Sequence, residues 1–132
     1  MSTDYPNDLR YTKEHEWARV DGNVITVGIT KFAVEQLGDI TSVELPGEGE
    51  EIRKEAVFGT VESVKAVSDL FAPVSGKVLK VNSPLSDSPE MVNDDCYDEG
   101  WMIQVEVADL AELTALMSAS DYQAYLKEQE SH

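Results

Sequence analysis

The chain has few of the residues on which active sites are most often built. Its 132 residues include one cysteine, Cys96, and two histidines, His15 and His132. A single cysteine excludes an internal disulfide and a cysteine-rich metal site. Zinc sites need three or four ligands that are usually His or Cys, and these three candidates are far apart in the sequence. Any Ser-His-Asp or Cys-His arrangement would depend on His15. We therefore expect no catalytic residue and no bound metal.

Positive charge is also scarce. Ten Lys and Arg residues stand against 26 Asp and Glu residues, which gives a formal net charge of −16. Such a charge repels a phosphate backbone, so nucleic acid is excluded as a partner. It favours a soluble monomer and can steer encounters with basic surfaces of larger partners. A plain solvated acidic surface explains the same composition.

Long apolar runs are missing. No segment approaches the roughly 18 apolar residues that cross a bilayer, so we expect no membrane contact. The first ten residues lack the apolar run of a signal peptide and the arginines of a transit peptide. We expect the chain in a bacterial-type cytoplasm, or in the mitochondrial matrix if it is a mature processed form.

The sequence does contain many short β-prone runs separated by turn residues, which favours a mainly β fold, a compact sandwich or barrel. The expected extended segments are 9–20, 24–29, 40–45, 56–64, 69–72, 77–81 and 101–107. A short helix is predicted over Lys31–Leu37, with Thr30 as its N-cap and Gly38 just past its end. The acidic stretch Glu48–Glu51 is expected to be a solvated loop.

Strand periodicity assigns faces within these runs. In 56–64, Val57, Gly59 and Val61 share one face, and Phe58, Thr60 and Glu62 share the other. In 77–81, Val78 lies with Lys80, and Leu79 lies with Val81. In 101–107, one face carries Trp101, Ile103, Val105 and Val107.

Helical signals appear late in the chain. Ser88-Pro89 is typical of the start of a short helical turn through Asn93. Asp109 with Glu112, and Ser120 with Gln123, have the spacing of capping devices. The last helix is predicted to direct Tyr122, Tyr125 and Leu126 inward. We expect one domain over residues 1–132, with a β core at about 9–107 and C-terminal helices at 109–130.

Lys65 lies between two of the β-prone runs. Its neighbours Ser63, Val64, Ala66 and Val67 are small or β-branched, so the pattern permits a hairpin with Lys65 near its tip. No Gly or Asn marks a type I′ turn there. On this pattern alone, an exposed solubilising lysine is the more ordinary interpretation.

Four blocks of the sequence together resemble the glycine cleavage system H protein family, in the same order and over about residues 9–125. The blocks are Tyr11-Thr12-Lys13-Glu14-His15-Glu16-Trp17; Val27-Gly28-Ile29-Thr30 with Gln36-Leu37-Gly38-Asp39-Ile40 and Val43-Glu44-Leu45-Pro46; Gly59 to Leu70 with Ala72-Pro73-Val74-Ser75-Gly76-Lys77-Val78; and Gly100-Trp101-Met102-Ile103.

The resemblance implies a hybrid barrel-sandwich fold with lipoate in amide linkage to Lys65. Lipoate-attaching enzymes would recognise the flanking residues Glu62, Ser63, Val64 and Ala66. Biotinyl carriers resemble this fold but have Met on both sides of their lysine, whereas Val64 and Ala66 occupy those places here.

The resemblance also implies a carrier without catalytic activity of its own. The arm would take an aminomethyl group from glycine at a pyridoxal-phosphate-dependent glycine decarboxylase (P protein). A tetrahydrofolate-dependent aminomethyltransferase (T protein) would receive the group, and dihydrolipoyl dehydrogenase (L protein) would reoxidise the arm. Tethering raises the effective concentration of the arm at each partner. Alternatives are a relay that passes lipoyl groups to other complexes, or an interaction module that has kept the fold without the cofactor.

By the same resemblance, Glu16 and Asp69 match positions of a cleft that shields the cationic intermediate, although solvated surface acids explain them equally well. Glu14 departs from the family, in which a smaller residue is frequent there. His15 is expected to form a structural hydrogen bond, and Trp17 and Trp101 are expected to pack in the core.

Overall fold

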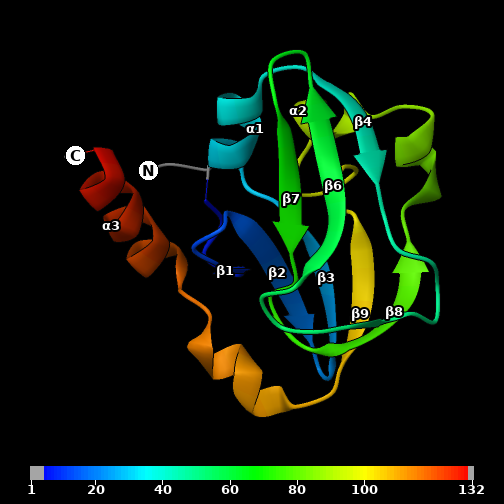
Figure 1. Ribbon diagram of the computed structural model, residues 1–132. Coiled ribbons are helices and arrows are strands. Elements are labelled where there is room, and N and C mark those ends of the chain that lie inside the picture. Colours follow the sequence, from blue (N-terminus) through cyan, green and yellow to red (C-terminus); the bar gives the residue numbers. More distant parts are fainter. Residues whose placement is uncertain (1–4, 131–132) are drawn as a thin grey trace.

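The computed structural model describes residues 5–130, without the side chains of residues 129 and 130. Two antiparallel β-sheets lie against each other, as predicted for a mainly β fold (Figure 1). The larger sheet has the spatial order β1 (Arg10–Tyr11), β2 (Glu16–Asp21), β3 (Val24–Ile29), β9 (Ile103–Val107), β8 (Gly76–Val81) and β5 (Glu51–Ile52). The smaller sheet has the order β4 (Ile40–Glu44), β6 (Val57–Ser63) and β7 (Val67–Phe71).

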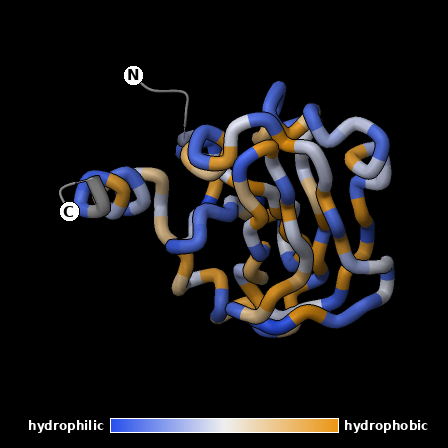
Figure 2. The backbone as a smooth tube through the Cα atoms, turned by 45° about the horizontal axis from the view of Figure 1, so that its top comes forward, coloured by the Kyte–Doolittle hydropathy of each residue, from blue (hydrophilic) through white to orange (hydrophobic). Residues whose placement is uncertain are grey.

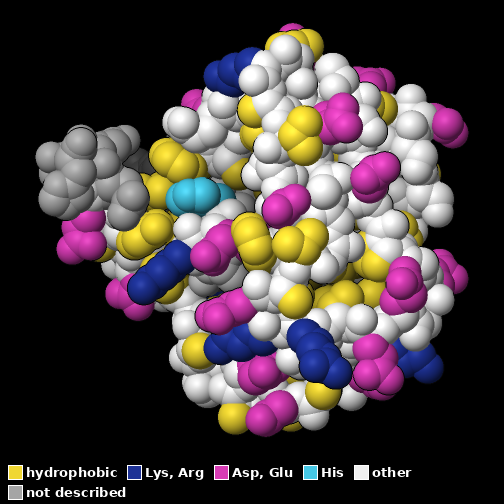
Figure 3. Space-filling view, viewed as in Figure 1, with side chains coloured by type: hydrophobic (Ala, Val, Ile, Leu, Met, Phe, Trp, Pro, Cys, Tyr) yellow, Lys and Arg dark blue, Asp and Glu magenta, His cyan; other side chains and the backbone are white. Residues whose placement is uncertain are grey.

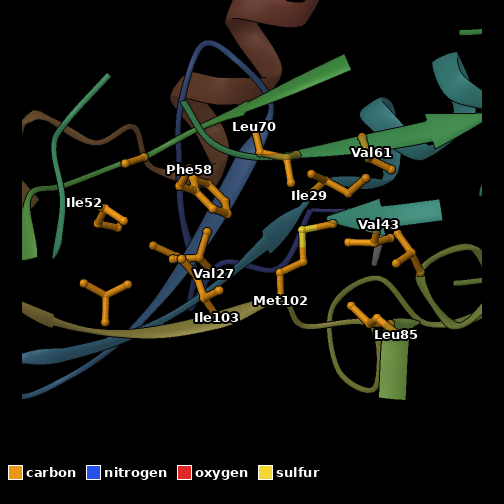
Figure 4. Packing of buried hydrophobic residues seen from close by; sticks show 14 of the residues in the cluster. Val27, Ile29, Val43, Ile52, Phe58, Val61, Leu70, Leu85, Met102 and Ile103 are labelled. Carbon is orange, nitrogen blue, oxygen red and sulfur yellow. The ribbon is translucent and has the colours of Figure 1, made fainter. Parts of the chain in front are cut away.

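The main hydrophobic core lies between the two sheets. In Figure 4, Phe58 and Leu70 of the smaller sheet lie above Val27 and Ile103 of the larger one, and Val61 lies beside Ile29. Hydrophobic and hydrophilic residues alternate along many of the strands (Figure 2), as expected for sheets with one face in the core and one in solvent. The β6–β7 hairpin is therefore fixed by its inner face, and its outer face is free to carry function.

Helix α1 (Lys31–Leu37) forms where it was predicted. The Thr30 hydroxyl accepts a hydrogen bond from the Ala33 N–H, which is the expected N-cap contact. Gly38 ends the helix with φ of +78°, a conformation that glycine adopts most readily. Seven residues are too few for a stable isolated helix, so the buried side chains of Val34 and Leu37 hold α1 on the core.

The predicted faces of β6 are wrong at its start. Val57 is 51% exposed and Phe58 is 7% exposed, whereas strict alternation groups Val57 with the buried Val61. The pairing with β7 shifts register between Val57 and Gly59, so an extra residue in β6 turns Phe58 inward. A similar shift between Val78 and Lys80 in β8 separates these two residues, since Val78 is buried and Lys80 is exposed.

Two other strand predictions need correction. Ile103, Val105 and Val107 share a buried face as predicted, but Trp101 lies before the strand and is only half-buried, while Met102 is fully buried. Glu51 is not part of a loop, because it pairs with Lys77 as the first residue of β5.

The late helices start at other residues than predicted. The last helix, α3, spans Ala119–Glu130, and its N-cap contact comes from the Ser118 hydroxyl, which accepts from the Asp121 N–H. The predicted start at Ser120 is therefore two residues too late. Helix α2 spans Met91–Asp94 and follows Glu90, so Ser88 contributes its carbonyl rather than its side chain.

The predicted capping box of Asp109 and Glu112 is only half formed. Asp109 accepts from the Ala111 N–H at the start of the 3₁₀ helix η2 (Leu110–Ala115). The Glu112 carboxylate instead accepts from the Ser75 N–H at 2.7 Å. A second 3₁₀ helix, η1 (Ser83–Ser86), follows β8.

A second, smaller core joins the two ends of the described chain. It consists of Leu9, Tyr11, Trp17, Ala119, Tyr122 and Leu126. Tyr122 and Leu126 are buried and Tyr125 is half-buried, as predicted for the inner face of the last helix. Trp17 is fully buried and donates from its indole nitrogen to the Cys96 carbonyl. None of the helices within residues 5–130 has the length and apolar character of a membrane-spanning helix.

Candidate functional site

Lys65 lies in the two-residue turn of the β6–β7 hairpin, as the sequence pattern suggested. The turn connects Ser63 and Ala66, whose backbone groups are joined by a 2.8 Å hydrogen bond from the Ser63 N–H to the Ala66 carbonyl. Figure 1 shows this tip projecting at one end of the molecule, beside α1 and the start of β4. The hairpin therefore presents Lys65 away from the core.

Ser63 supplies the turn chemistry that Gly or Asn would otherwise provide. Its hydroxyl accepts hydrogen bonds from the N–H groups of Lys65 (3.3 Å) and Ala66 (3.1 Å). Serine hydroxyls stabilise turns in this way. Val64 and Lys65 are not among the residues with positive φ, so the turn is not type I′. The missing Gly or Asn signal is thus explained by Ser63.

The turn is also attached to the segment between α1 and β4. The Val64 N–H donates to the Asp39 carbonyl at 3.1 Å. The Lys65 side chain passes over Gly38, since a Cβ atom built on Gly38 would lie 3.6 Å from Lys65 Cε. The Val64–Asp39 hydrogen bond joins two backbone groups, so side-chain motion does not disturb it.

The Lys65 side chain itself is exposed. Its ammonium group makes no hydrogen bond or ion pair with any residue in the range 5–130. Two valines close to it are also strongly exposed, Val64 at 71% and Val67 at 67%. Two neighbouring valines with this much exposed surface are available for contact with another molecule. Acidic side chains are spread over the face seen in Figure 3, where basic side chains are fewer.

Glu16 lies in a different part of the same sheet pair, near the far end of β7. It is 1% exposed, and both carboxylate oxygens have partners: Oε1 accepts from the Thr12 hydroxyl at 2.7 Å, and Oε2 accepts from the Phe71 N–H at 3.3 Å. Burial raises the pKa of Glu16 to about 8, although these two hydrogen bonds lower it and the neighbouring Glu14 raises it further.

A pocket of about 280 Å³ lies against Glu16. Its charged lining consists of Lys13, Glu14, Glu16, Lys54 and Glu55. Asp69 is not among the lining residues, and its side chain is exposed on β7, where the residue pairs with Thr60. Glu16 binds the backbone of Phe71, which lies two positions after Asp69 in β7. The two predicted cleft residues are therefore near each other, but they do not line one pocket.

His15 forms the structural hydrogen bond expected of it. Its Nδ1 lies 2.7 Å from the Tyr122 hydroxyl, which is also 2.8 Å from the Thr30 hydroxyl. Burial lowers the pKa of His15. His15 has φ of +71° in the turn between β1 and β2, and this turn places Glu16 at the first position of β2.

Sequence patterns did not indicate three residues that shape this region. Thr12 holds the Glu16 carboxylate, Gly38 lies under Lys65, and Asn93 binds the backbone of the segment beside the turn. The sequence predicted that Gly38 ends the helix, but its position under Lys65 is a folded contact between distant parts of the chain. Thr12 and Asn93 act across folded contacts that no local pattern reports.

Comparison with known proteins decides the family. The family model described as glycine cleavage H-protein matches residues 9–129. The chain belongs to the glycine cleavage H-protein family. Glycine cleavage system H proteins of Anaeromyxobacter sp. (strain K) and Carboxydothermus hydrogenoformans are 60% and 56% identical to it, over 95% and 94% of this chain and 98% and 95% of theirs.

A solved structure of the family confirms the fold class. The crystal structure of a glycine cleavage system H protein from Mycobacterium marinum superimposes with a TM-score of 0.85 at 38% identity, covering 92% of this chain and 98% of that one. The hybrid barrel-sandwich predicted from the resemblance is therefore confirmed.

Membership of the H-protein family establishes the general role. The chain is a lipoyl carrier of the glycine cleavage system and not itself an enzyme. Proteins of this family carry lipoate covalently on a lysine and work with the P, T and L proteins of the system. An exposed lysine at a rigid hairpin tip is a suitable attachment point for such a group.

Proposed function

We propose that Lys65 is the residue that carries lipoate, in an amide bond to Nζ. The exposed position of Lys65 at the hairpin tip supports this proposal, because an attaching enzyme must reach Nζ without unfolding the sheet. By contrast, Lys77 and Lys80 lie within the strand β8 rather than at a hairpin tip, where Lys77 pairs with both Glu51 and Glu106 and Lys80 pairs with Gln104.

The residues around Lys65 form the segment that lipoate-attaching enzymes would recognise. Glu62 and Val64 present exposed side chains, and Ala66 is exposed as well. Ser63 contributes differently, since its hydroxyl is used to hold the turn. We infer that recognition depends on the shape of the turn together with the side chains of Glu62 and Val64.

Lipoate on Lys65 would supply a disulfide that accepts the aminomethyl group derived from glycine and is reduced in the transfer, so that one sulfur would carry the group and the other would become a thiol. The chain's own contribution is position: the core holds Phe58, Val61 and Leu70 fixed, and the hairpin holds Lys65 outward. Tethering keeps the arm at a high effective concentration at each partner. The net charge of −16 favours approach to basic surfaces on those partners.

The decisive experiment is the substitution Lys65→Arg, which keeps the positive charge but removes the primary amine. We expect the purified protein from lipoate-replete cells to show a lipoyl-sized mass increment on the peptide containing Lys65, and Lys65→Arg to show none. In a reconstituted glycine cleavage system, Lys65→Arg should be inactive. Lys80→Arg is the matched control and should keep both the increment and the activity. A lipoylated Lys65→Arg protein would contradict the proposal.

We further propose that Glu16 and Asp69 keep the amine cargo on the carrier. Glu16 supports this idea because it lines the pocket, and a cation entering there would favour its ionised form. Glu16→Gln should therefore release ammonia from the loaded carrier several times faster than the parent, as followed by ammonia assay. Asp69→Asn tests the exposed carboxylate separately. Unchanged release rates in both variants would remove these residues from the mechanism.

We place the protein in the cytoplasm of a bacterium. The relatives named above are bacterial glycine cleavage system H proteins, and a chain with one buried cysteine suits a reducing compartment. Fractionation of the source cells would test this placement.

A further inference from the structure

Asn93 binds the backbone next to Lys65 with both ends of its side-chain amide. Its Oδ1 accepts from the Ile40 N–H at 2.9 Å, and its Nδ2 donates to the Gly38 carbonyl at 2.8 Å. These partners fix the orientation of the amide, because an N–H can only donate and a carbonyl can only accept. Asn93 lies on α2, 28 residues after Lys65 in the sequence.

The segment that Asn93 holds is the one that contacts the lysine turn. Gly38 and Ile40 flank Asp39, and the Asp39 carbonyl accepts the Val64 N–H at 3.1 Å. Gly38 also lies under the Lys65 side chain. Gly38 has φ of +78° and ψ of −146°, a region used almost only by glycine. This conformation ends α1 and directs the chain toward the turn.

Asn93 therefore stands at the start of a short series of contacts that ends at the lysine. Asn93 fixes Gly38 and Ile40, these fix the direction of the Asp39 carbonyl, and that carbonyl holds Val64, the residue before Lys65. On the other side of the turn, Ser63 holds Lys65 and Ala66 through its hydroxyl. The turn is thus fixed on one side by its own serine and on the other by a distant asparagine.

We propose that Asn93 is a positioning residue for Lys65, which orders the turn so that an attaching enzyme meets the lysine in one preset geometry. This inference rests on the proposed role of Lys65 as the attachment site. A turn ordered in advance costs less to bind than one ordered on binding. Loss of Asn93 should then weaken capture of the carrier while leaving the chemical step intact.

The first test measures hydrogen exchange at the Val64 amide by NMR. In Asn93→Ala, we expect exchange of the Val64 amide to be about tenfold or more faster, the factor that corresponds to one hydrogen bond of ordinary strength. Amides in β8 and β9 should keep their protection. Asn93→Asp keeps the acceptor for Ile40 but cannot donate to Gly38, so it should also speed exchange at Val64.

Asn82→Ala provides the matched control. Asn82 is a buried asparagine whose Nδ2 donates to two backbone carbonyls, of Glu99 at 2.9 Å and Trp101 at 2.6 Å, away from the lysine turn. Its removal should lower the melting temperature without a selective change at Val64. If the Val64 amide loses its protection from hydrogen exchange in Asn93→Ala but not in Asn82→Ala, Asn93 positions the turn and does not only stabilise the fold.

The second test measures lipoate attachment to the unmodified protein by a lipoate-attaching enzyme, at a temperature where all variants are folded. For Asn93→Ala, we expect the KM for the carrier to rise about tenfold, in line with one lost hydrogen bond, and kcat to stay within about twofold of the parent. Asn82→Ala should keep the parent KM.

The outcomes separate the two proposals. Lipoate on Lys65→Arg would overturn the role of Lys65 itself. Lipoate confined to Lys65, together with an unchanged KM and unchanged Val64 exchange in Asn93→Ala, would overturn only the positioning role of Asn93.

Discussion

Glu16 illustrates how one residue can couple the state of a pocket to the stability of the fold. Among the described residues, Glu16 is the only Asp, Glu, Lys or Arg residue whose side chain is buried. It joins the turn after β1, through Thr12, to the end of β7, through Phe71. Burial raises the pKa of Glu16 to about 8, so the folded protein holds a proton there at neutral pH that the unfolded chain releases.

The sign of the resulting pH dependence follows from this difference. Between the ordinary pKa of 4.5 and the folded pKa of about 8, the folded state binds more protons than the unfolded state. Stability therefore falls as pH rises through this window, and the contribution of Glu16 becomes constant above it. Below pH 4.5 both states are protonated and the contribution is likewise constant.

We predict that Glu16→Gln removes this dependence. The free energy of unfolding of the parent should fall relative to Glu16→Gln by up to about 1.4 kcal/mol per pH unit between pH 5 and 8. Urea unfolding at several pH values measures the difference. Glu62→Gln, at an exposed position on β6, is the control and should follow the parent. Parallel curves for the parent and Glu16→Gln would show that Glu16 is ionised in the folded protein.

At the scale of elements, the smaller sheet depends on a close approach between β4 and β6. A Cβ atom on Gly59 would lie 2.3 Å from the Glu44 carbonyl oxygen, a distance that backbone atoms cannot accommodate without moving. The bulge at Phe58 is adjacent, so the same short stretch both turns Phe58 into the core and brings β4 near. Glycine is required at position 59 by space rather than by φ.

We predict that Gly59→Ala destabilises the protein by about 1–3 kcal/mol, because overpacking forces strands apart. Chemical denaturation measures the change. Gly47→Ala is the control, since a Cβ atom there would meet only the exposed Glu50 side chain, at 3.3 Å. Equal free energies of unfolding for the two variants would mean that β4 can move away from position 59 without destabilising the protein.

These elements also show what the sequence could and could not predict. The Lys31–Leu37 helix was predicted correctly because its cap, its apolar residues and its terminal glycine are all local. The faces at the start of β6 were not, because a bulge depends on the pairing partner. Ser120 was predicted as a cap from spacing alone, but Ser118 is the residue whose hydroxyl meets the free N–H of Asp121.

The candidate site divides in the same way. The local pattern suggested a hairpin at Lys65, and the resemblance across four blocks predicted that this lysine carries lipoate. The support from Asn93 and Gly38 could not be predicted, because it joins α2, the end of α1 and the hairpin only after folding. The burial of Glu16 could not be predicted either, since a glutamate that follows the polar run Thr12-Lys13-Glu14-His15 has the sequence pattern of a surface residue.

At the scale of the whole molecule, the C-terminal helix packs on the β core through the second hydrophobic core, and within that core Tyr122 also makes hydrogen-bond contacts. The Tyr122 hydroxyl contacts His15 of the β1–β2 turn and Thr30, the N-cap of α1. Its ring stacks on Tyr11 with centroids 4.8 Å apart. Burial raises the pKa of Tyr122 well above its usual range, so the hydroxyl keeps its proton. We propose that this connection makes α3 and the β core a single domain.

Tyr122→Phe tests that connection, because it keeps the ring and removes the hydroxyl. We predict a loss of about 1–3 kcal/mol in the free energy of unfolding, since the His15 and Thr30 side chains each lose a buried partner. The half-buried Tyr125 on the same helix is the control, and Tyr125→Phe should change stability by less than about 0.5 kcal/mol. In the parent, backbone amides of α3 and β9 should exchange with the same free energy of opening, whereas in Tyr122→Phe the α3 amides should open first. A parent in which α3 already opens independently of β9 would show instead that the helix is an appendage that contributes nothing to holding the β core together.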